Sequence, residues 1–260
     1  WRSLWQSPEA TAAYEALGVH GFDGYFASRA AAMGAVSAEV VIATFFNFNP
    51  DLVHAAIPRA WEATTPAQLV AARRDAAGVA LRRATSSDLD TPDVVKALEL
   101  ATTAAEACAA AGRPLYAAHA GLTWPEPAHV ALWHAITLLR EFRGDGHLAA
   151  LVDAGLEGID ALVVHAASGE VSRAVLQTSR GWSDEAWEDS VGRLAARGLL
   201  ERDGSFTEAG AALRQHIEDR TDVLALAPWA ALGQEGCDEL RALVRPLSKA
   251  IVESGTFGFR

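Results

Sequence analysis

The residues best suited to chemistry lie in one stretch near the middle of the chain, Arg-Glu-Phe-Arg-Gly-Asp-Gly-His from Arg140 to His147. Arg140 and Arg143 are three residues apart, so on a helix they share a face and could hold a carboxylate or a phosphate between them. The Gly-Asp-Gly sequence before His147 predicts a tight turn that brings this histidine back over the arginines. We therefore predict a site for an anionic group here, with His147 as a candidate catalytic acid or base.

The segment before this stretch, residues 130–139, is apolar almost all round, which predicts a central helix. It carries His134, the second candidate catalytic acid or base. In the alternative interpretation, the charged residues of 140–145 form an ion-pair network that joins two helices. Because polar clusters inside apolar bundles need either partners or a ligand, both interpretations stay open.

Three further groups of polar or aromatic residues are candidates for binding the same ligand. Tyr25 and Arg29 are four residues apart, about one helical turn, and the alternative for them is aromatic core packing with bonds to the backbone. Asn47 lies at a corner between two helices, as a left-handed C-cap or as a hydrogen-bonding group of the pocket. His119 and Trp124 flank the loop before the central helix, which is a natural pocket rim, although a single histidine is often structural.

No motif in the sequence identifies a cofactor, which stays unknown. HxxxH, HExxH, CxxC, GxSxG, Walker and GxGxxG patterns are all missing from it. His129 and His134 are five residues apart, which is about 140° around a helix of ~3.6 residues per turn, so they do not chelate one ion. We predict no metal site, and an ion held by His134, His147 and a carboxylate stays open as an alternative.

The elements that must position these residues are helices, as recurrent start signals indicate. Capping residues followed by proline open helices at Ser7, Asn49, Thr65 and Thr91. We predict a mainly α fold of about a dozen helices. Residues 1–165 are alanine-rich and apolar on wide arcs, which predicts a helical bundle around a ligand pocket. A second domain with the C-terminal helices is predicted at 166–260.

The second domain contains a strongly marked helix at 183–198. Ser183 is the predicted N-cap, and Trp182 and Trp187 take the two positions of a hydrophobic staple. Gly198 supplies the left-handed stop. An Asp-Gly turn then predicts one short β-hairpin near 199–206, before the next helix begins.

The order of helix, short wing and helix, with the run ARGLLERDGSFTEAG, resembles the winged helix of MarR-type regulators over residues 168–222. The stretches GYFASRAAAMG, VSAEVVIATFFNF, HVALWHAITLLREFRGDGHLAALV and RGWSDEAWEDSVGRLAARGLL resemble an actinobacterial family of helix-turn-helix proteins of unknown activity. This resemblance implies an architecture, a helical bundle fused to a MarR-like winged helix with one β-hairpin. It implies no activity.

The charge of the second domain departs from what DNA binding requires. The first half of its recognition helix carries Asp184, Glu185, Glu188 and Asp189, and no base. Residues 168–222 hold eleven carboxylates against seven arginines, a net charge of about −4 by residue type. The chain as a whole has a formal net charge of −11. Because phosphate repels carboxylates, we expect no DNA partner.

Composition and length point to a packed globular protein, with 50% hydrophobic and 21% charged residues. Cys108 and Cys237 show no CxxC spacing, which favours reduced thiols in the cytoplasm. No apolar run approaches membrane-crossing length, so we expect a cytoplasmic protein with no membrane partner. A homodimer stays open.

These observations predict a protein that binds a hydrophobic or aromatic metabolite with an anionic group, by means of the pocket of the bundle. Whether it also transforms this small-molecule ligand stays open. Its winged helix would no longer bind DNA. The alternatives are a MarR-type, ligand-responsive transcriptional regulator, and a scaffold or oligomer interface.

Overall fold

The computed structural model describes residue 4 and residues 7–85 and 89–254, and most of this part of the chain is helical. The helices are α1 (Pro8–Glu15), α2 (Gly21–Ala30), the 3-10 turn η2 (Ala31–Met33), α3 (Ala38–Phe45), α4 (Pro50–Ala63), α5 (Pro66–Thr85), α6 (Pro92–Glu106), α7 (Pro114–Ala120), α8 (Ala128–Asp153), α9 (Gly158–Ala167), α10 (Arg173–Arg180), α11 (Asp184–Ala196), α12 (Glu208–Leu224) and α13 (Ala227–Glu253). The predicted mainly α fold is therefore confirmed.

Most helices begin where the sequence places a cap. The caps whose side chains accept a backbone N–H of the first turn include Ser7, Asn49, Thr91, Ser183 and Thr207. A reciprocal capping box forms before α5, where the Gln68 N–H donates to the Thr65 hydroxyl at 3.3 Å and the Thr65 N–H donates to Gln68 Oε1 at 3.1 Å. Each such cap stabilises a helix by about 1 kcal/mol, so local sequence decides where these helices start.

The predicted turn at Gly-Asp-Gly, residues 144–146, is wrong. α8 continues through it from Ala128 to Asp153. Close packing explains the glycine at 146, because a Cβ there would lie 2.7 Å from Nη1 of Arg113 and 3.2 Å from Cβ of Leu224. The Arg113 guanidinium donates to the carbonyl oxygens of Phe142 and Leu224 across this gap. Tertiary packing thus outweighs the low helix propensity of glycine.

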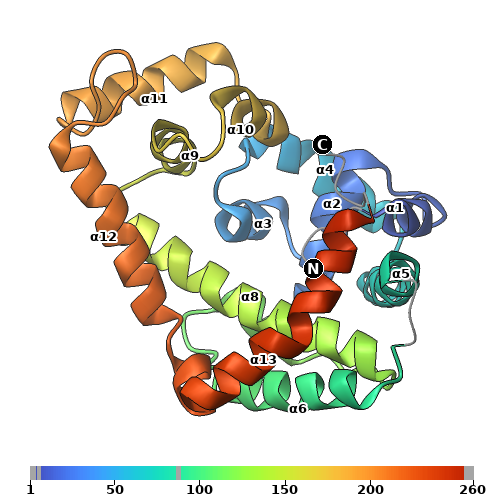
Figure 1. The fold of residues 1–260 in the computed structure, drawn as a ribbon. Coiled ribbons are helices and arrows are strands. Elements are labelled where there is room, and N and C mark those ends of the chain that lie inside the picture. Colours follow the sequence, from blue (N-terminus) through green and yellow to red (C-terminus); the bar gives the residue numbers. More distant parts are fainter. Residues whose placement is uncertain (1–3, 5–6, 86–88, 255–260) are drawn as a thin grey trace.

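α8 lies at the centre of the fold and connects its two sides (Figure 1). Its first half packs into a core shared by α5, α6 and α13, which includes Leu132 and Leu240. Its last turns join the core of α9 to α12, which includes Leu151 and Leu194. Figure 1 shows α9, α10 and α11 grouped on one side of the molecule and α1, α2, α4 and α5 on the other.

The last helix, α13, packs along α6 rather than on α11 and α12, which come directly before it in the chain (Figure 1). Its buried residues Leu240 and Ile251 lie in the same core as Leu81 and Leu132. Residues 227–253 therefore complete the bundle formed by the first part of the chain. The predicted boundary at 165/166 stays a prediction.

The predicted β-hairpin is not seen. In the segment between α11 and α12, the structure has one antiparallel bridge, between Leu200 and Phe206, and no strand is assigned in the described part of the chain. The Glu201 N–H donates to the Ser205 carbonyl at 2.8 Å, and the Asp203 carboxylate accepts from the Ser205 N–H and hydroxyl. The segment is too short to extend this bridge into a ladder, because the turn uses the residues between the paired positions.

No single helix among the described residues is long and apolar enough to cross a membrane. The helical segments Gly21–Met33 and Ala38–Phe45 reach the length and apolar composition of a membrane span only when taken together, and the chain bends by 94° between them.

Candidate functional site

A cavity of about 330 Å³ lies where α5, α7 and the first half of α8 meet. Apolar side chains form much of its wall, and its polar lining side chains are Arg73, Arg74, His119, Thr123, His134 and Thr137. No Asp or Glu from the described ranges lines it, so its charged lining groups are cationic. A mostly apolar cavity with a few convergent polar groups is typical of small-molecule sites.

His134 is one of the residues that line this cavity. Its helix segment is buried nearly throughout, and His134 itself is only 4% exposed. Nε2 of His134 is buried and has no hydrogen-bond partner in the part of the chain that the structure describes. The Trp124 ring meets the imidazole edge-on, with 5.0 Å between the centroids. Because a buried polar atom without a partner costs about 1–3 kcal/mol, a ligand atom that bonded Nε2 would be stabilising.

Burial, together with the charge of Arg73, lowers the pKa of His134 to about 4. The imidazole is therefore neutral near pH 7. A neutral imidazole has one N–H donor and one acceptor nitrogen. Nε2 of His134 can thus donate or accept one hydrogen bond, according to its tautomer.

Arg73 reaches the cavity from the buried face of α5. It follows Leu69 by about one helical turn and precedes Ala77 by another, and both of these are buried, so helical periodicity turns Arg73 inward. Its Nη1 donates to Nε2 of His119 at 2.9 Å, and its guanidinium lies 5.3 Å from the centre of the Trp133 ring. Burial lowers the pKa of Arg73 to about 10, which leaves it a cation at neutral pH.

His119 holds this arginine in place without adding charge. Its Nδ1–H donates to the Leu115 carbonyl at 2.9 Å, which leaves a lone pair on Nε2 for the Arg73 N–H. Burial and then the charge of Arg73 lower the pKa of His119 to about 3. The positive charge of the cavity wall therefore comes from its arginines.

Tyr25 and Arg29 lie in a second buried polar cluster, not in the lining of the cavity. Arg29 donates through Nη1 to the Tyr25 hydroxyl at 2.9 Å, and its Nη2 lies 3.5 Å from the Glu141 carboxylate. Arg140 donates to the other oxygen of Glu141 at 2.5 Å. Burial alone would raise the pKa of Glu141, but the charges of Arg29 and Arg140 outweigh it and hold that pKa below its usual range.

Arg143 does not join Arg140 in a fork. Its Nη2 lies 3.3 Å from Glu218 and 3.4 Å from Asp222, both on α12. Arg140 instead binds Glu141. The two arginines therefore hold different carboxylates, and Arg143 ties α8 to α12 at a half-exposed position.

His147 also faces α12, away from the cavity lining. The Thr221 hydroxyl donates to the Ile217 carbonyl at 2.7 Å, so Nδ1 of His147, at 2.9 Å, is the donor to that hydroxyl. Because α8 is continuous, it does not bring His147 back toward His134. Among the described residues, no group of three or more His, Cys, Asp or Glu side chains could hold a metal ion.

Asn47 lies at the junction with the end of α10. Its Oδ1 accepts from Nε of Arg180 at 3.3 Å, and its carbonyl accepts from Nε1 of Trp182 at 3.0 Å. The prediction that Asn47 is a left-handed cap is wrong, because Phe46 takes that position with φ of 49°. α9 packs directly on this turn, since a Cβ at Gly158 would lie 2.0 Å from the Phe46 carbonyl oxygen.

The sequence analysis missed Arg73, although the sequence contains a signal for it. Arg73 falls on the apolar stripe of its helix, and the neighbouring Arg74 and Asp75 do not. The other residues of the stripe include Leu69, Ala76, Ala77 and Ala80. An arginine on such a stripe is buried on folding, and a buried guanidinium needs polar partners.

The segment from α10 to α11 has the geometry of a helix-turn-helix unit. α10 ends at Gly181, whose φ is 73°, and α11 begins after the Ser183 cap. Arg173 of α10 lies across the start of α11, with Nη2 3.0 Å from Asp184 and Nη1 2.5 Å from Glu188. The first turns of α11 are thus held by ion pairs within the unit.

The two arginines of α11 bind the protein itself. Nη2 of Arg193 lies 2.9 Å from the buried carboxylate of Asp160. Arg197 donates to the carbonyl oxygens of Gly155 at 2.8 Å and Ala154 at 3.0 Å. Because these arginines already bind protein acceptors and the exposed surface of α11 also carries Glu185 and Asp189, the helix offers phosphate little attraction.

A short helix, a left-handed glycine and a second helix, both packed on α9, define a helix-turn-helix protein with a large all-helical bundle. The chain belongs to the helix-turn-helix family, whose sequence profile matches residues 3–258. This match confirms the predicted membership of a helix-turn-helix family. No curated protein and no solved structure matches the chain.

Proposed function

We propose that this protein binds a small aromatic or apolar molecule with an anionic group in the cavity between α5, α7 and α8. The observation that carries the proposal is His134, which lines that cavity and whose Nε2 is buried and has no hydrogen-bond partner within the described ranges. A ligand would bond this atom and so remove the cost of burying it unsatisfied.

The anionic character follows from the charge of the cavity wall. The lining contains Arg73 and Arg74 and, among the described residues, no carboxylate. A carboxylate group near Arg73 would gain a charge-assisted interaction in a poorly solvated place. Val70, Leu122 and Trp133 supply the apolar surface for the body of the molecule.

His134 fits a binding role better than a catalytic one at neutral pH. A general base works best with a pKa near the operating pH, and the pKa of His134 is about 4. An anionic ligand beside the ring would raise that pKa, because a negative charge favours imidazolium. If the ligand is transformed, His134 is the acid-base candidate in contact with it, and His147 lies at the α8–α12 interface instead.

We also propose that residues 168–222 form a MarR-like winged helix that no longer binds DNA. The order of α10, α11, the bridge of Leu200 with Phe206, and α12 supports the winged-helix topology. Arg193 and Arg197 bind Asp160 and the Gly155 carbonyl, which supports the loss of DNA binding. The second candidate function is a ligand-responsive regulator of transcription, which membership of the helix-turn-helix family favours.

Two measurements test the ligand proposal. Native mass spectrometry of protein purified from its own host should show a bound small molecule that is released on unfolding. Calorimetry with benzoate and 2-naphthoate as probes should then show binding that weakens about tenfold or more in His134→Leu, the scale of one hydrogen bond to a charged group.

Arg143→Met is the matched control, because Arg143 lies on the same helix as His134 but binds Glu218 of α12 and does not line the cavity. It should bind the probes as the wild type does. Unchanged affinity in His134→Leu would place the ligand elsewhere. No co-purified molecule and no probe binding, in a protein that runs as a stable oligomer, would favour the scaffold alternative.

A further inference from the structure

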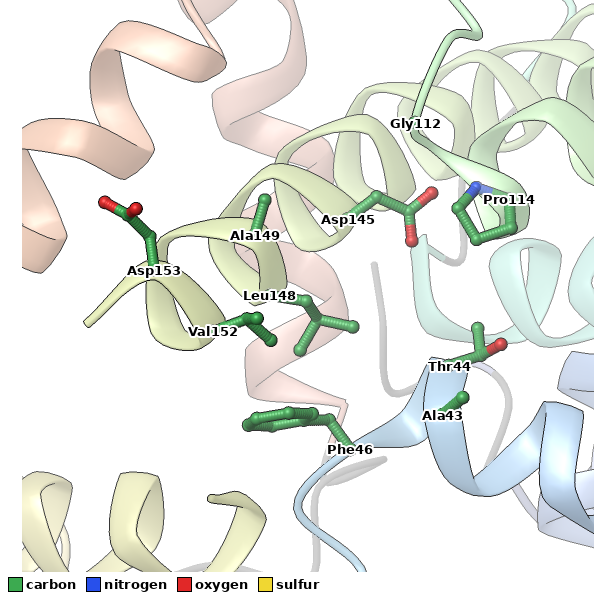
Figure 2. Close-up of a pocket in the computed structure, with 10 residues that line it drawn as sticks. All are labelled: Ala43, Thr44, Phe46, Gly112, Pro114, Asp145, Leu148, Ala149, Val152 and Asp153. Carbon is green, nitrogen blue, oxygen red and sulfur yellow. The ribbon is translucent and has the colours of Figure 1, made fainter. Parts of the chain in front are cut away.

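A second cavity, of about 430 Å³, lies between the end of α3, the start of α7 and the second half of α8 (Figure 2). It is separate from the His134 cavity, because the two share no lining residue. Its apolar wall includes Phe46, Leu148 and Val152. Its polar lining side chains are Thr44, Asp145 and Asp153.

Charge distinguishes the two cavities. In the described part of the chain, no Lys, Arg or His lines this second cavity, whereas two carboxylates do. Figure 2 shows the Asp145 carboxylate turned toward Pro114, and the Asp153 carboxylate at the far end of the same helix, directed away from it. Asp145 is buried and Asp153 is exposed, so Asp145 is the carboxylate that a bound molecule would meet out of water.

The Asp145 carboxylate accepts the Tyr116 N–H at 2.9 Å near the start of α7. No Lys, Arg or His of the described residues forms an ion pair with it. The nearby Arg113 binds the carbonyl oxygens of Phe142 and Leu224 instead. Burial, the largest cause, raises the pKa of Asp145 above its usual range, and it outweighs the opposing effects of the backbone N–H donors and of the Arg113 charge.

Thr44 adds a second acceptor to the same wall. Its hydroxyl hydrogen goes to the Val40 carbonyl at 2.6 Å, so the lone pairs of Oγ1 are what it offers to the cavity. The polar side chains here therefore accept hydrogen bonds rather than donate them. One buried carboxylate with one hydroxyl is too few ligands for a metal ion, whereas an ammonium group supplies both a charge and N–H donors.

We propose that this cavity binds a primary or secondary ammonium ion with a small apolar substituent, held by Asp145 and Thr44. The apolar group would lie against Phe46, Leu148 and Val152. This second site is independent of the anion-binding cavity at His134.

Benzylamine is the probe, and benzyl alcohol is its uncharged match in shape. Calorimetry on the full chain should show benzylamine binding, with benzyl alcohol weaker by about tenfold or more. Asp145→Asn should weaken benzylamine by a similar factor, because Asn keeps an acceptor for the Tyr116 N–H and removes the charge. Asp153→Asn removes an exposed carboxylate from the same helix as the matched control, and its affinity should stay within about threefold of the wild type.

Failure of benzylamine to bind the wild type at millimolar concentration would overturn the proposal. Equal affinity in Asp145→Asn would overturn it too, and would leave Asp145 as a cap of α7 alone. Amide chemical shifts of the wild type decide the matter without any variant. Benzylamine should shift the signals of 43–46 and 145–152, and shifts confined to other residues would contradict the assignment.

Discussion

An ion pair between Arg193 and Asp160 joins α11, the second helix of the helix-turn-helix unit, to α9, with 2.9 Å between Nη2 of Arg193 and Oδ1 of Asp160. The same oxygen of Asp160 accepts the Ser190 hydroxyl at 2.6 Å. Asp160 is 4% exposed, and its carboxylate is stabilised by these two donors from α11 and by the Glu157 N–H, which donates to Oδ2 at 3.3 Å. The Arg193 guanidinium thus supplies the countercharge of a buried carboxylate.

Arg193→Gln should therefore destabilise the protein by about 1–2 kcal/mol, because it removes a charged donor from a buried acceptor that keeps its other hydrogen bonds. Urea unfolding would measure the change. The control is Arg202→Gln, which removes an exposed arginine outside α11 and should change the free energy of unfolding by less than about 0.5 kcal/mol. Equal effects of the two substitutions would contradict the assigned role of Arg193.

The protein should not bind a specific DNA duplex at physiological salt. Glu185 and Asp189 are exposed on α11, and its arginines bind other parts of the chain. A gel shift with the DNA upstream of its own coding sequence is the test, and the double variant Glu185→Lys with Asp189→Lys should gain weak, salt-sensitive binding. Tight wild-type binding that weakens as salt rises would instead favour the regulator.

Two glycines of α8 should respond in opposite directions to substitution by alanine. At Gly144 the nearest atom to a new Cβ is Oε2 of Glu141 at 3.8 Å, an ordinary contact. Gly144→Ala should therefore stabilise the protein by up to about 1 kcal/mol through helix propensity. At Gly146 the Cβ would meet Arg113 at 2.7 Å, so Gly146→Ala should cost about 1–3 kcal/mol through overpacking. Stabilisation by both would show that Arg113 moves aside at no cost.

Stability should fall as pH drops below about 6.5. The pKa of His134 is about 4 and that of His119 about 3 in the folded protein, against 6.5 for an ordinary histidine. As pH falls, the unfolded chain takes up these protons first. The free energy of unfolding is therefore highest above pH 6.5, and it decreases between pH 6.5 and the folded pKa values. Each group contributes up to about 1.4 kcal/mol per pH unit within its window.

Urea unfolding at pH 7.5 and pH 5 measures this dependence. His134→Leu should show a smaller difference between the two pH values than the wild type, since one of the two shifted groups is gone. Equal free energies of unfolding for the wild type at the two pH values would contradict the burial of neutral histidines.

Local sequence predicted the helices well because their start signals act over a few residues. Ser7, Asn49, Thr91 and Ser183 cap helices as expected, since a cap needs only its own first turn. The predicted turn at 144–146 was wrong because Gly146 packs against Arg113 and Leu224, which are far away in sequence. Local rules carry no information about such partners.

In the candidate site too, local sequence predicted some residues, and partners distant in sequence determined the others. His134 was predicted from its place on an apolar helix, and it lines a cavity. The predicted fork of Arg140 and Arg143 was inferred from their spacing alone, and in the structure Arg140 binds Glu141 while Arg143 binds Glu218. Arg73 was missed because its partner His119 is distant in sequence, and only its position on the buried stripe of α5 indicates it.

The junction between the bundle and the helix-turn-helix unit has a consequence for how the chain tolerates change. Three of its acceptors are main-chain carbonyls. Asn49 donates to those of Arg180 at 3.0 Å and Gly181 at 2.9 Å, and Trp182 donates to that of Asn47 at 3.0 Å. A carbonyl oxygen survives replacement of its own side chain, so substitutions at 47 or 180 leave these acceptors available. Gly181 is different, because its φ is 73° and a Cβ there would lie 2.3 Å from Cδ1 of Leu52. Insertion of a single residue into either loop would shift the acceptors out of register. Relatives should therefore vary at 47 and 180 and yet keep Gly181 and the same loop lengths.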